Sequence, residues 1–482
     1  EEQICSIDPP GCQDIDDALH AKPLPNGNIE VGVHIADVSY FVRPDTPMDA
    51  EAASRGTTVY LVDKRIDMLP HLLGTNLCSL RPFVERLAFS ALWEMTPDAN
   101  VVSVRFTKSV IASKAAFTYE DAQKRKDDAT LDDPITTSIR LLNKLAIQLK
   151  QRRMAAGALN LASPEVRIQM DSSESSGPID VEQKQLFETN SLVEEFMLLA
   201  NTSCAQRIYE AYPTTAVLRR HAPPPEDNFE TLKDILKKRR GMELDTSSSG
   251  ALAASLDRCV DPSDPTFNTL VRILATRCML AAEYFCTGSV ARNAFGHYGL
   301  AMGMYTHFTS PIRRYADVLA HRQLAAAIGY EPLPSSLYSK QYVDDVLNVV
   351  NKRHRLGQLA GRASVEFYVG LSIMARNAER GADATHVGKG GETRLLRADA
   401  YVVRTFRNGL AVFVSKYGLE GLITFKQDCE FDADTYQVTV PAQVSGLSRD
   451  VTLGIFDRCQ VEIGVEKDRS TKRGRVKMAL VL

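Results

Sequence analysis

The sequence has little of several features that would place it in a specialised class. It has one tryptophan, no long apolar run, and a net charge of only −3 from 57 basic and 60 acidic side chains in 482 residues. Charged residues interrupt the hydrophobic stretches well before the roughly 18 residues that a membrane-spanning helix needs, so no transmembrane helix and no membrane partner are predicted. The near-neutral charge by itself gives no indication of nucleic acid, and such a partner would need a local field.

Cysteine and histidine patterns are equally uninformative of a standard metal or thiol site. The nine cysteines occur singly, with no CxxC pair, and a scattered odd set suits a reducing compartment better than a disulfide framework. The sequence contains no HxxxH, HExxH, nucleophile-elbow serine or GxxxxGK[ST] loop, so protease, lipase and P-loop interpretations lack support. The chain begins with Glu1 rather than Met, without a signal peptide, and we expect that it was cut from a longer protein.

The composition, 44% hydrophobic and 24% charged, is typical of a globular chain. The first hundred residues predict strands, including Ile29–Val42 after the hairpin signal Asn26-Gly27. A helical period follows from about 118, and the candidate helices are 134–156, 181–212, 227–240, 266–288, 311–329 and 339–377. Polar, Gly-rich breaks fall at 171–180 and 379–393, and short strands return from 395.

This pattern predicts two units. The first is an α/β (α+β) catalytic domain over 1–378, with a mixed sheet and surrounding helices. The second is an all-β barrel over 395–482, because about five short strands in some 90 residues suit a small closed barrel. The segment 379–394 between them is predicted to be a linker or flexible loop.

Four carboxylates within ten residues form the strongest local signal, in the sequence DPPGCQDIDD. In an extended segment Asp14 and Asp16 would point to one side, and the Pro-Pro-Gly turn would bring Asp8 back to join them and Asp17. Clustered carboxylates repel one another unless a cation lies between them, and oxygen ligands without His or Cys favour Mg²⁺ or Mn²⁺. A solvated acidic turn is the alternative.

A second signal is the segment YTHFTSPIRRYADVLAHR over 305–322. Ser310 is a suitable N-cap and Pro311 a suitable first helical residue, which predicts Arg313 and Arg314 in the first turn of a helix. Cations there oppose the helix dipole, but backbone N–H groups and a guanidinium could converge on a phosphate. An exposed arginine pair with a salt bridge to Asp317 is the alternative.

Three weaker signals add candidate RNA contacts. Glu194 and Glu195 lie in an otherwise apolar helix, where at least one is expected on the surface. The basic pair Arg219 and Arg220 precedes His221 and three prolines, and could line a backbone channel or end a helix. Tyr60 and Tyr119 could stack on bases, although such tyrosines are more often core residues.

Taken together, these segments resemble the RNase II/RNase R family of 3′→5′ exoribonucleases along almost the whole chain, as a catalytic RNB domain followed by an S1 domain. The form of the acidic motif is closer to the eukaryotic exosome's RNase II-type subunit than to the bacterial enzymes. That subunit carries a PIN domain and two cold-shock domains ahead of RNB. The motifs that carry the resemblance are IDPPGCQDIDDALH, VGVHIADVSYFV, RGTTVYLVDKRIDMLP, LCSLRP, GALNLASPEV, NSLVEEFMLLAN, LRRHAPPP and HFTSPIRRYADVLAHR.

The resemblance implies roles for individual residues. Asp8, Asp14, Asp16 and Asp17 would hold Mg²⁺, with two ions expected and Mn²⁺ able to replace them, and loss of Asp16 should abolish chemistry while sparing RNA binding. Arg313 would lie on the scissile phosphate. Contacts to RNA are expected from Arg314, Tyr60, Tyr119, one of the pair Glu194 and Glu195, Arg219 and Arg220, and, in the S1-like segment, from Lys472 and Arg473 within a basic track that includes Lys467, Arg469 and Arg475.

The implied activity is processive hydrolysis of single-stranded RNA to nucleoside 5′-monophosphates, in RNA processing and decay. Exosome core subunits would be partners, largely through the missing N-terminal domains, in the nucleus and nucleolus and also in the cytoplasm. Two competitors remain. A non-catalytic RNA-binding scaffold would be expected to lack at least one metal aspartate, and none is lacking. A generic Mg²⁺-dependent phosphatase or DNA nuclease explains the acids but not the S1-like barrel.

Overall fold

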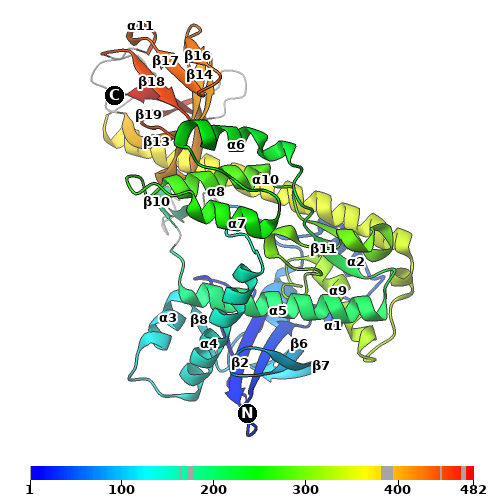
Figure 1. The fold of residues 1–482 in the computed structure, drawn as a ribbon. Helices are drawn as coiled ribbons and strands as arrows, with labels where there is room; N and C mark the ends of the chain where they lie inside the picture. Colours follow the sequence, from blue (N-terminus) through cyan, green and yellow to red (C-terminus); the bar gives the residue numbers. More distant parts are fainter. Residues whose placement is uncertain are drawn as a thin grey trace.

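A computed structural model of the chain describes residues 2–161, 166–170, 178–183, 185–381, 395–445, 448–467 and 474–481. A six-stranded mixed sheet lies at one end, an all-β barrel at the other, and the long helix α10 (Lys340–Glu379) runs between them (Figure 1). None of the helices among the described residues is long and apolar enough to cross a membrane. This is the predicted fold class, an RNB-type α/β unit followed by a barrel.

The sheet has the strand order β7-β6-β3-β2-β1-β8, in which only β1 and β8 pair in parallel. Leu19, Val33 and Trp93 face helices α4 and α5, and the opposite face is also buried. The strands of the sheet are β1 (Cys5–Asp8), β2 (Asp17–Pro23), β3 (Ile29–Ala36), β6 (Glu85–Met95), β7 (Val101–Ala112) and β8 (Ala115–Thr118). The helices around it are α1 (Val38–Phe41), α2 (Pro47–Arg55), α3 (Tyr119–Asp127), α4 (Pro134–Ala155), α5 (Glu188–Ala211) and α9 (Tyr315–Ala327).

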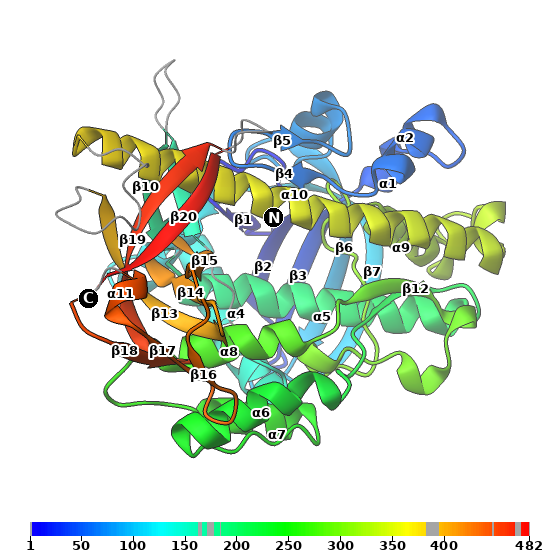
Figure 2. The same ribbon diagram turned by 90° about the horizontal axis from the view of Figure 1, so that it is seen from above.

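Smaller elements join this unit to the barrel. Two-stranded pairs are formed by β4 (Val59–Tyr60) with β5 (Arg65–Ile66), β9 (Val166–Met170) with β10 (Pro178–Gln183), and β11 (Val217–Arg220) with β12 (Glu283–Cys286). Helices α6 (Asp227–Arg240), α7 (Ser249–Arg258) and α8 (Phe267–Cys278) pack beside the barrel. Viewed from above, α10 passes across the sheet and reaches the barrel (Figure 2), and it contacts β4 and β12 on one side and β19 on the other.

The barrel combines a five-stranded sheet, β15-β14-β13-β19-β20, with the three-stranded sheet β16-β17-β18. Its ends meet where Gly421 of β15 lies against Met478 of β20, because a Cβ at position 421 would fall 2.3 Å from the Met478 sulfur. The elements are β13 (Leu396–Phe406), β14 (Gly409–Val414), β15 (Leu419–Thr424), β16 (Glu430–Asp432), β17 (Gln437–Val440), α11 (Ala442–Ser445), β18 (Val451–Gly454), β19 (Arg458–Lys467) and β20 (Gly474–Val481).

Several boundaries differ from the sequence expectations. The strand expected over Ile29–Val42 ends at Ala36, its last residue paired with β6, and the chain turns into α1. The helices expected over 181–212 and 266–288 each include a strand, β10 and β12. Most of 171–180 and 379–393 lies outside the described residues.

Candidate active site

Strand pairing brings the four acidic residues to one end of the sheet. Asp8 is the last residue of β1 and Asp17 the first of β2, and these neighbouring antiparallel strands are joined by the loop that carries Asp14 and Asp16. Gly11, with a φ of +79°, makes the turn of this loop, and such a φ favours glycine. Asp14 lies at a bend of this loop, and Asp14 and Asp16 meet different arginines, Arg65 and Arg313.

Two of the aspartates form ion pairs with arginine side chains. Asp16 receives the Ile312 backbone N–H on Oδ1 at 3.0 Å and the Arg313 Nε on Oδ2 at 3.2 Å. The Arg65 guanidinium binds both Asp14 and Asp67, and the Tyr60 hydroxyl lies 3.5 Å from the other Asp14 oxygen. Arg65 was not singled out from the sequence, although it belongs to the quoted RIDMLP motif.

The other two aspartates form no ion pair with any described residue. Asp8 Oδ2 and Asp17 Oδ2 are both buried and, within the same ranges, have no hydrogen-bond partner. Burial raises the pKa of Asp8 to about 6 and that of Asp16 to about 7, and burial together with the charges of Asp8 and Asp16 raises the pKa of Asp17 well above its ordinary value. Unpaired carboxylate oxygens of this kind are expensive to bury, and their donor chemistry fits a hard divalent cation.

The aspartates are nevertheless not gathered tightly around one point. Across the described ranges, the one group of three potential ligand atoms within 4.8 Å of one another lies elsewhere, at Glu2, His20 and Glu30. Mutual repulsion of carboxylates and the two arginine pairs at Asp14 and Asp16 account for this spread.

Arg313 and Arg314 do not lie in a helical first turn, which corrects the prediction for 311–329. Helix α9 begins only at Tyr315, because the segment before it forms backbone pairs with Thr57 and Thr58. The Arg313 side chain is 41% exposed and is turned toward Asp16. Arg314 instead donates to both oxygens of the fully buried Asp317, at 2.9 and 2.8 Å. This is the salt bridge of the alternative considered, but the arginine that makes it is only 14% exposed.

The two predicted tyrosines lie beside the acids from different directions. Tyr60 is half-exposed on the β4–β5 pair. Tyr119 follows β8, whose last residue Thr118 pairs with Asp8, and burial raises its pKa, with the charges of Asp17 and Asp8 adding to the effect. The structure therefore brings Tyr60, Tyr119 and Arg313 to the same strand ends as the carboxylates.

The glutamate pair on α5 is divided between core and surface. Glu195 is 3% exposed and is bound by Arg153 of α4 at 2.6 Å, whereas Glu194 is 52% exposed. Arg153 was missed from the sequence, because only the packing of α4 on α5 brings it opposite Glu195.

The basic pair on β11 is also divided, by the alternation of side chains along a strand. Arg219 is 9% exposed, lies 4.5 Å from the centre of the Tyr284 ring, and has a buried Nη1 without a hydrogen-bond partner. Arg220 is paired with Glu283 at 2.6 Å on the neighbouring strand β12. Lys472 and Arg473 lie outside the described residues. Of the expected basic track, the structure describes Lys467 as the last residue of β19 and Arg475 as an exposed residue of β20.

Several aromatic rings of the barrel are turned inward. Tyr401 and Phe413 are buried against the group of helices α6, α7 and α8, where Phe267 and Phe456 meet edge to face at 5.1 Å. These rings therefore join the barrel to the first unit instead of forming an exposed stacking surface.

A separate buried polar cluster, formed by Asp49, Tyr315 and Arg322, joins α2 to α9. Arg322 donates to Asp49 at 2.6 Å and to the Val42 carbonyl at 2.9 Å, and the Tyr315 hydroxyl donates to Asp49 at 2.8 Å. Both Asp49 oxygens are paired in this cluster, although Arg322 Nε has no hydrogen-bond partner among the described residues. A buried carboxylate held by a tyrosine and an arginine is the arrangement of a structural brace.

Comparison with known proteins agrees with this architecture. The RNB domain family matches residues 1–330, and the S1 domain family matches 396–478. The chain belongs to the RNB domain family. It is 57% identical over its whole length to the exosome complex exonuclease dis3 of Schizosaccharomyces pombe, of which it covers 48%.

Two solved structures share the fold along the whole chain. RNase R of Mycoplasma genitalium in its apo form superimposes with a TM-score of 0.81 at 21% identity, and the chain covers 71% of it. Yeast Ssd1, described as a pseudonuclease, superimposes with a TM-score of 0.79 at 18% identity, with 67% of it covered. At these identities the likeness concerns the fold alone. The chain spans about half the length of the curated relatives it matches.

Proposed function

We propose that this chain is the catalytic portion of a hydrolytic 3′→5′ exoribonuclease that degrades single-stranded RNA processively to nucleoside 5′-monophosphates. The observation that carries the proposal is the pair of buried, unpartnered oxygens on Asp8 and Asp17 beside the half-exposed Arg313. A bound cation would satisfy these oxygens, which are costly to bury unpaired. The family match and the relatives named as exosome exonucleases support it.

Asp8, Asp14, Asp16 and Asp17 would hold the divalent cations, proposed as two Mg²⁺ that Mn²⁺ can replace. When bound at these carboxylates, the ions would supply Lewis-acid activation of a water and stabilisation of the leaving 3′ oxygen in an in-line displacement. Arg313 neutralises charge that develops on the scissile phosphate, since its exposed guanidinium is held in place by Asp16 and by Ser310 Oγ at 3.0 Å.

The remaining candidate residues bind and orient the RNA. Tyr60 and Tyr119 stack on bases near the 3′ end. Glu194, the exposed member of its pair, contacts the terminal nucleotide, while Glu195 is held in the core by Arg153. Contacts to ribose hydroxyls would favour RNA over DNA.

The basic residues would follow the RNA backbone. Arg219, with an unpaired donor, meets a phosphate, and Arg220, Arg314, Lys472 and Arg473 contribute positive charge along the path. Residues 1–378 form the catalytic domain and 395–482 the RNA-binding domain, joined by the linker 379–394. In cells the protein would work with exosome core subunits in the nucleus and nucleolus and in the cytoplasm.

The test is release of labelled mononucleotides from uniformly labelled single-stranded RNA in Mg²⁺, with Asp16→Asn as the control and DNA of the same sequence as a second substrate. We expect mononucleotides from RNA alone, abolished in the control while RNA binding persists. A wild-type chain that is folded, binds RNA and is as inert as Asp16→Asn would instead identify a non-catalytic RNA-binding relative, the state named for Ssd1. Equal degradation of DNA would indicate a general nuclease.

A further inference from the structure

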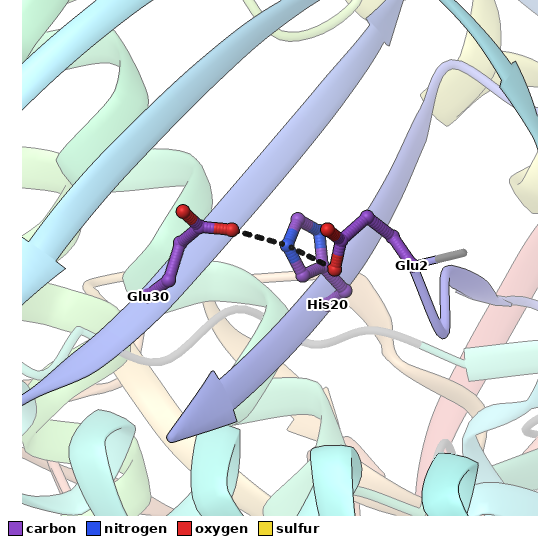
Figure 3. A group of neighbouring side chains, drawn as sticks. All are labelled: Glu2, His20 and Glu30. Atoms are coloured by element: carbon purple, nitrogen blue, oxygen red, sulfur yellow. Dashed lines mark hydrogen bonds and ion pairs between the residues drawn. The ribbon is translucent and has the colours of Figure 1, made fainter. Parts of the chain in front are cut away.

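A second cluster of potential metal ligands lies away from the aspartates, at the opposite end of β2. Glu2 precedes β1, His20 lies on β2, and Glu30 lies on β3 beside it (Figure 3). His20 Nε2 is 3.5 Å from Glu2 Oε2 and 3.4 Å from Glu30 Oε1. One ligand atom from each residue lies within 4.8 Å of the other two.

The two separations measured from His20 match those of a tetrahedral metal site. Zinc bonds to imidazole nitrogen and carboxylate oxygen measure about 2.0–2.1 Å, and a tetrahedron with such bonds sets neighbouring ligand atoms about 3.3–3.4 Å apart. Both distances from His20 to the carboxylates are close to this value. One histidine and two glutamates supply three ligands and leave a fourth position open toward solvent, since both carboxylates are partly exposed.

The sheet holds the His20 ring in a fixed orientation. Its Nδ1 bonds to His34 Nε2 at 2.9 Å, His34 Nδ1 bonds to Ser90 Oγ at 2.7 Å, and Ser90 bonds to Ser109 at 2.6 Å. This series of hydrogen bonds crosses β2, β3, β6 and β7. A partner on the second ring nitrogen is what orients a metal-bound histidine, so the support for Nε2 as a ligand is already built.

Gly32 of β3 makes room for the ring. A Cβ at this position would lie 2.2 Å from His20 Cε1 and 2.4 Å from His20 Nδ1. Only glycine therefore lets the imidazole lie flat across the neighbouring strand, where Nε2 is brought between the two carboxylates.

The ammonium group of Lys22 already pairs with both carboxylates. Lys22 Nζ lies 2.5 Å from Glu2 and 3.0 Å from Glu30. Its side chain is 42% exposed, and ion pairs of such exposed lysines are weak. The ammonium can therefore leave for solvent when a better cation arrives.

We propose that Glu2, His20 and Glu30 form a zinc site, separate from the acidic cluster, that ties the segment before β1 to the β2–β3 hairpin. Lys22 competes with the metal for the two carboxylates. The site does not depend on the proposed nuclease activity, and its loss should leave that activity unchanged.

The test is the Zn²⁺ stoichiometry and affinity of the whole chain, measured by equilibrium dialysis and calorimetry in excess Mg²⁺, which occupies the acidic cluster. The wild-type chain should retain one Zn²⁺ that Mg²⁺ does not displace. Glu30→Gln should weaken its binding about tenfold or more, and Lys22→Met should strengthen it. Glu94→Gln is the matched control. Glu94 is the cross-strand partner of Glu30 between β3 and β6, so this substitution removes the same charge without removing a proposed ligand.

The higher Zn²⁺ affinity expected for Lys22→Met distinguishes a zinc site from a simple ion-pair cluster. A gain in affinity also cannot result from misfolding of the variant. An ion-pair cluster predicts that Lys22→Met only destabilises the chain and takes up no more Zn²⁺ than the wild type. Equal Zn²⁺ uptake by the wild type, Glu30→Gln and Glu94→Gln, with each variant folded by circular dichroism, would overturn the proposal and assign the binding to thiols or other surface groups.

Discussion

Two polar clusters meet at α9, and they differ in how completely their carboxylates are paired. Both oxygens of Asp49 accept from Arg322, which holds α2 against α9, although Arg322 Nε has no hydrogen-bond partner among the described residues. Just before the same helix, Arg313 reaches Asp16, while one oxygen each of Asp8 and Asp17 has no partner in the described part of the chain. Asp49, Tyr315 and Arg322 are buried, whereas Asp8, Asp14 and Asp17 are partly exposed. The unpaired carboxylate oxygens therefore mark the cluster that needs a ligand from outside.

Removing a charge from the unpaired cluster should have the largest effect, and only on activity. Asp17→Asn is expected to lower the rate of RNA hydrolysis by about 10⁴-fold, the scale on which loss of one member of a catalytic group acts. Thermal denaturation without metal should show an unchanged or higher midpoint, because one repelling buried charge is gone. A variant that loses stability with its activity would show that Asp17 belongs to a brace.

The same type of change in the paired cluster should have the opposite outcome. Asp49→Ala leaves the Arg322 charge buried and uncompensated, and should cost about 3–5 kcal/mol of unfolding free energy. Urea denaturation measures this loss. The matched control is Glu51→Ala, which breaks an exposed ion pair with Arg55 on the same helix and should cost about 0.5 kcal/mol or less. Equal costs in the two variants would remove the distinction between brace and surface pair.

Arg313 and Arg314 allow a residue of the candidate site to be compared with its neighbour in a buried ion pair. Arg313→Ala should reduce kcat about 10²–10³-fold, as expected for one lost charge-stabilising group, with little change in stability. Arg314→Ala exposes the unpaired charge of buried Asp317 and should cost about 3 kcal/mol. Kinetics and denaturation of both variants test this, and the prediction is wrong if Arg314→Ala stays fully stable.

The smallest expected effect is a pH dependence that metal removes. Because burial raises the pKa of Asp8 to about 6 and that of Asp16 to about 7, the folded chain binds these protons more tightly than the unfolded chain does. Their contribution to stability is present at low pH and is lost as the pH rises through 6 and 7. The loss should be about 1 kcal/mol or more, the free energy of one unit of pKa shift.

Denaturation at a series of pH values with and without Mg²⁺ measures this effect. Added Mg²⁺ should stabilise the chain more at high pH, where the carboxylates have lost their protons, than at low pH. A stabilisation by Mg²⁺ that does not change with pH would place its binding outside this cluster. Asp17→Asn should abolish the Mg²⁺ effect, because it removes a carboxylate from the proposed site.

Local sequence signals predicted the helices well where caps and periodicity coincide. The expectations of 134–156 and 227–240 correspond to α4 and α6, and Asp133 caps α4 by accepting from the backbone of Ile135 and Thr136. The acidic motif and the resemblance identified the strand ends that carry the candidate site.

Contacts between distant segments could not be predicted in the same way. The start of α9 is delayed by backbone pairing with Thr57 and Thr58, some 256 positions earlier. The ion pair of Asp49 with Arg322 spans 273 positions. Nothing in the local spacing indicated that Arg65 would bind Asp14, because a two-residue strand pair brings it there.

Helix α10 fixes the orientation of the barrel relative to the acidic cluster. Its 40 residues extend about 60 Å at 1.5 Å per residue, one portion lying against β4 and the other against the barrel. Gly361 lets it pass close to the Tyr60 carbonyl, since a Cβ there would lie 3.2 Å from that oxygen. One residue inserted between these contacts would turn the barrel by about 100° relative to the acidic cluster. The number of residues in α10 therefore determines the direction from which the barrel faces the site.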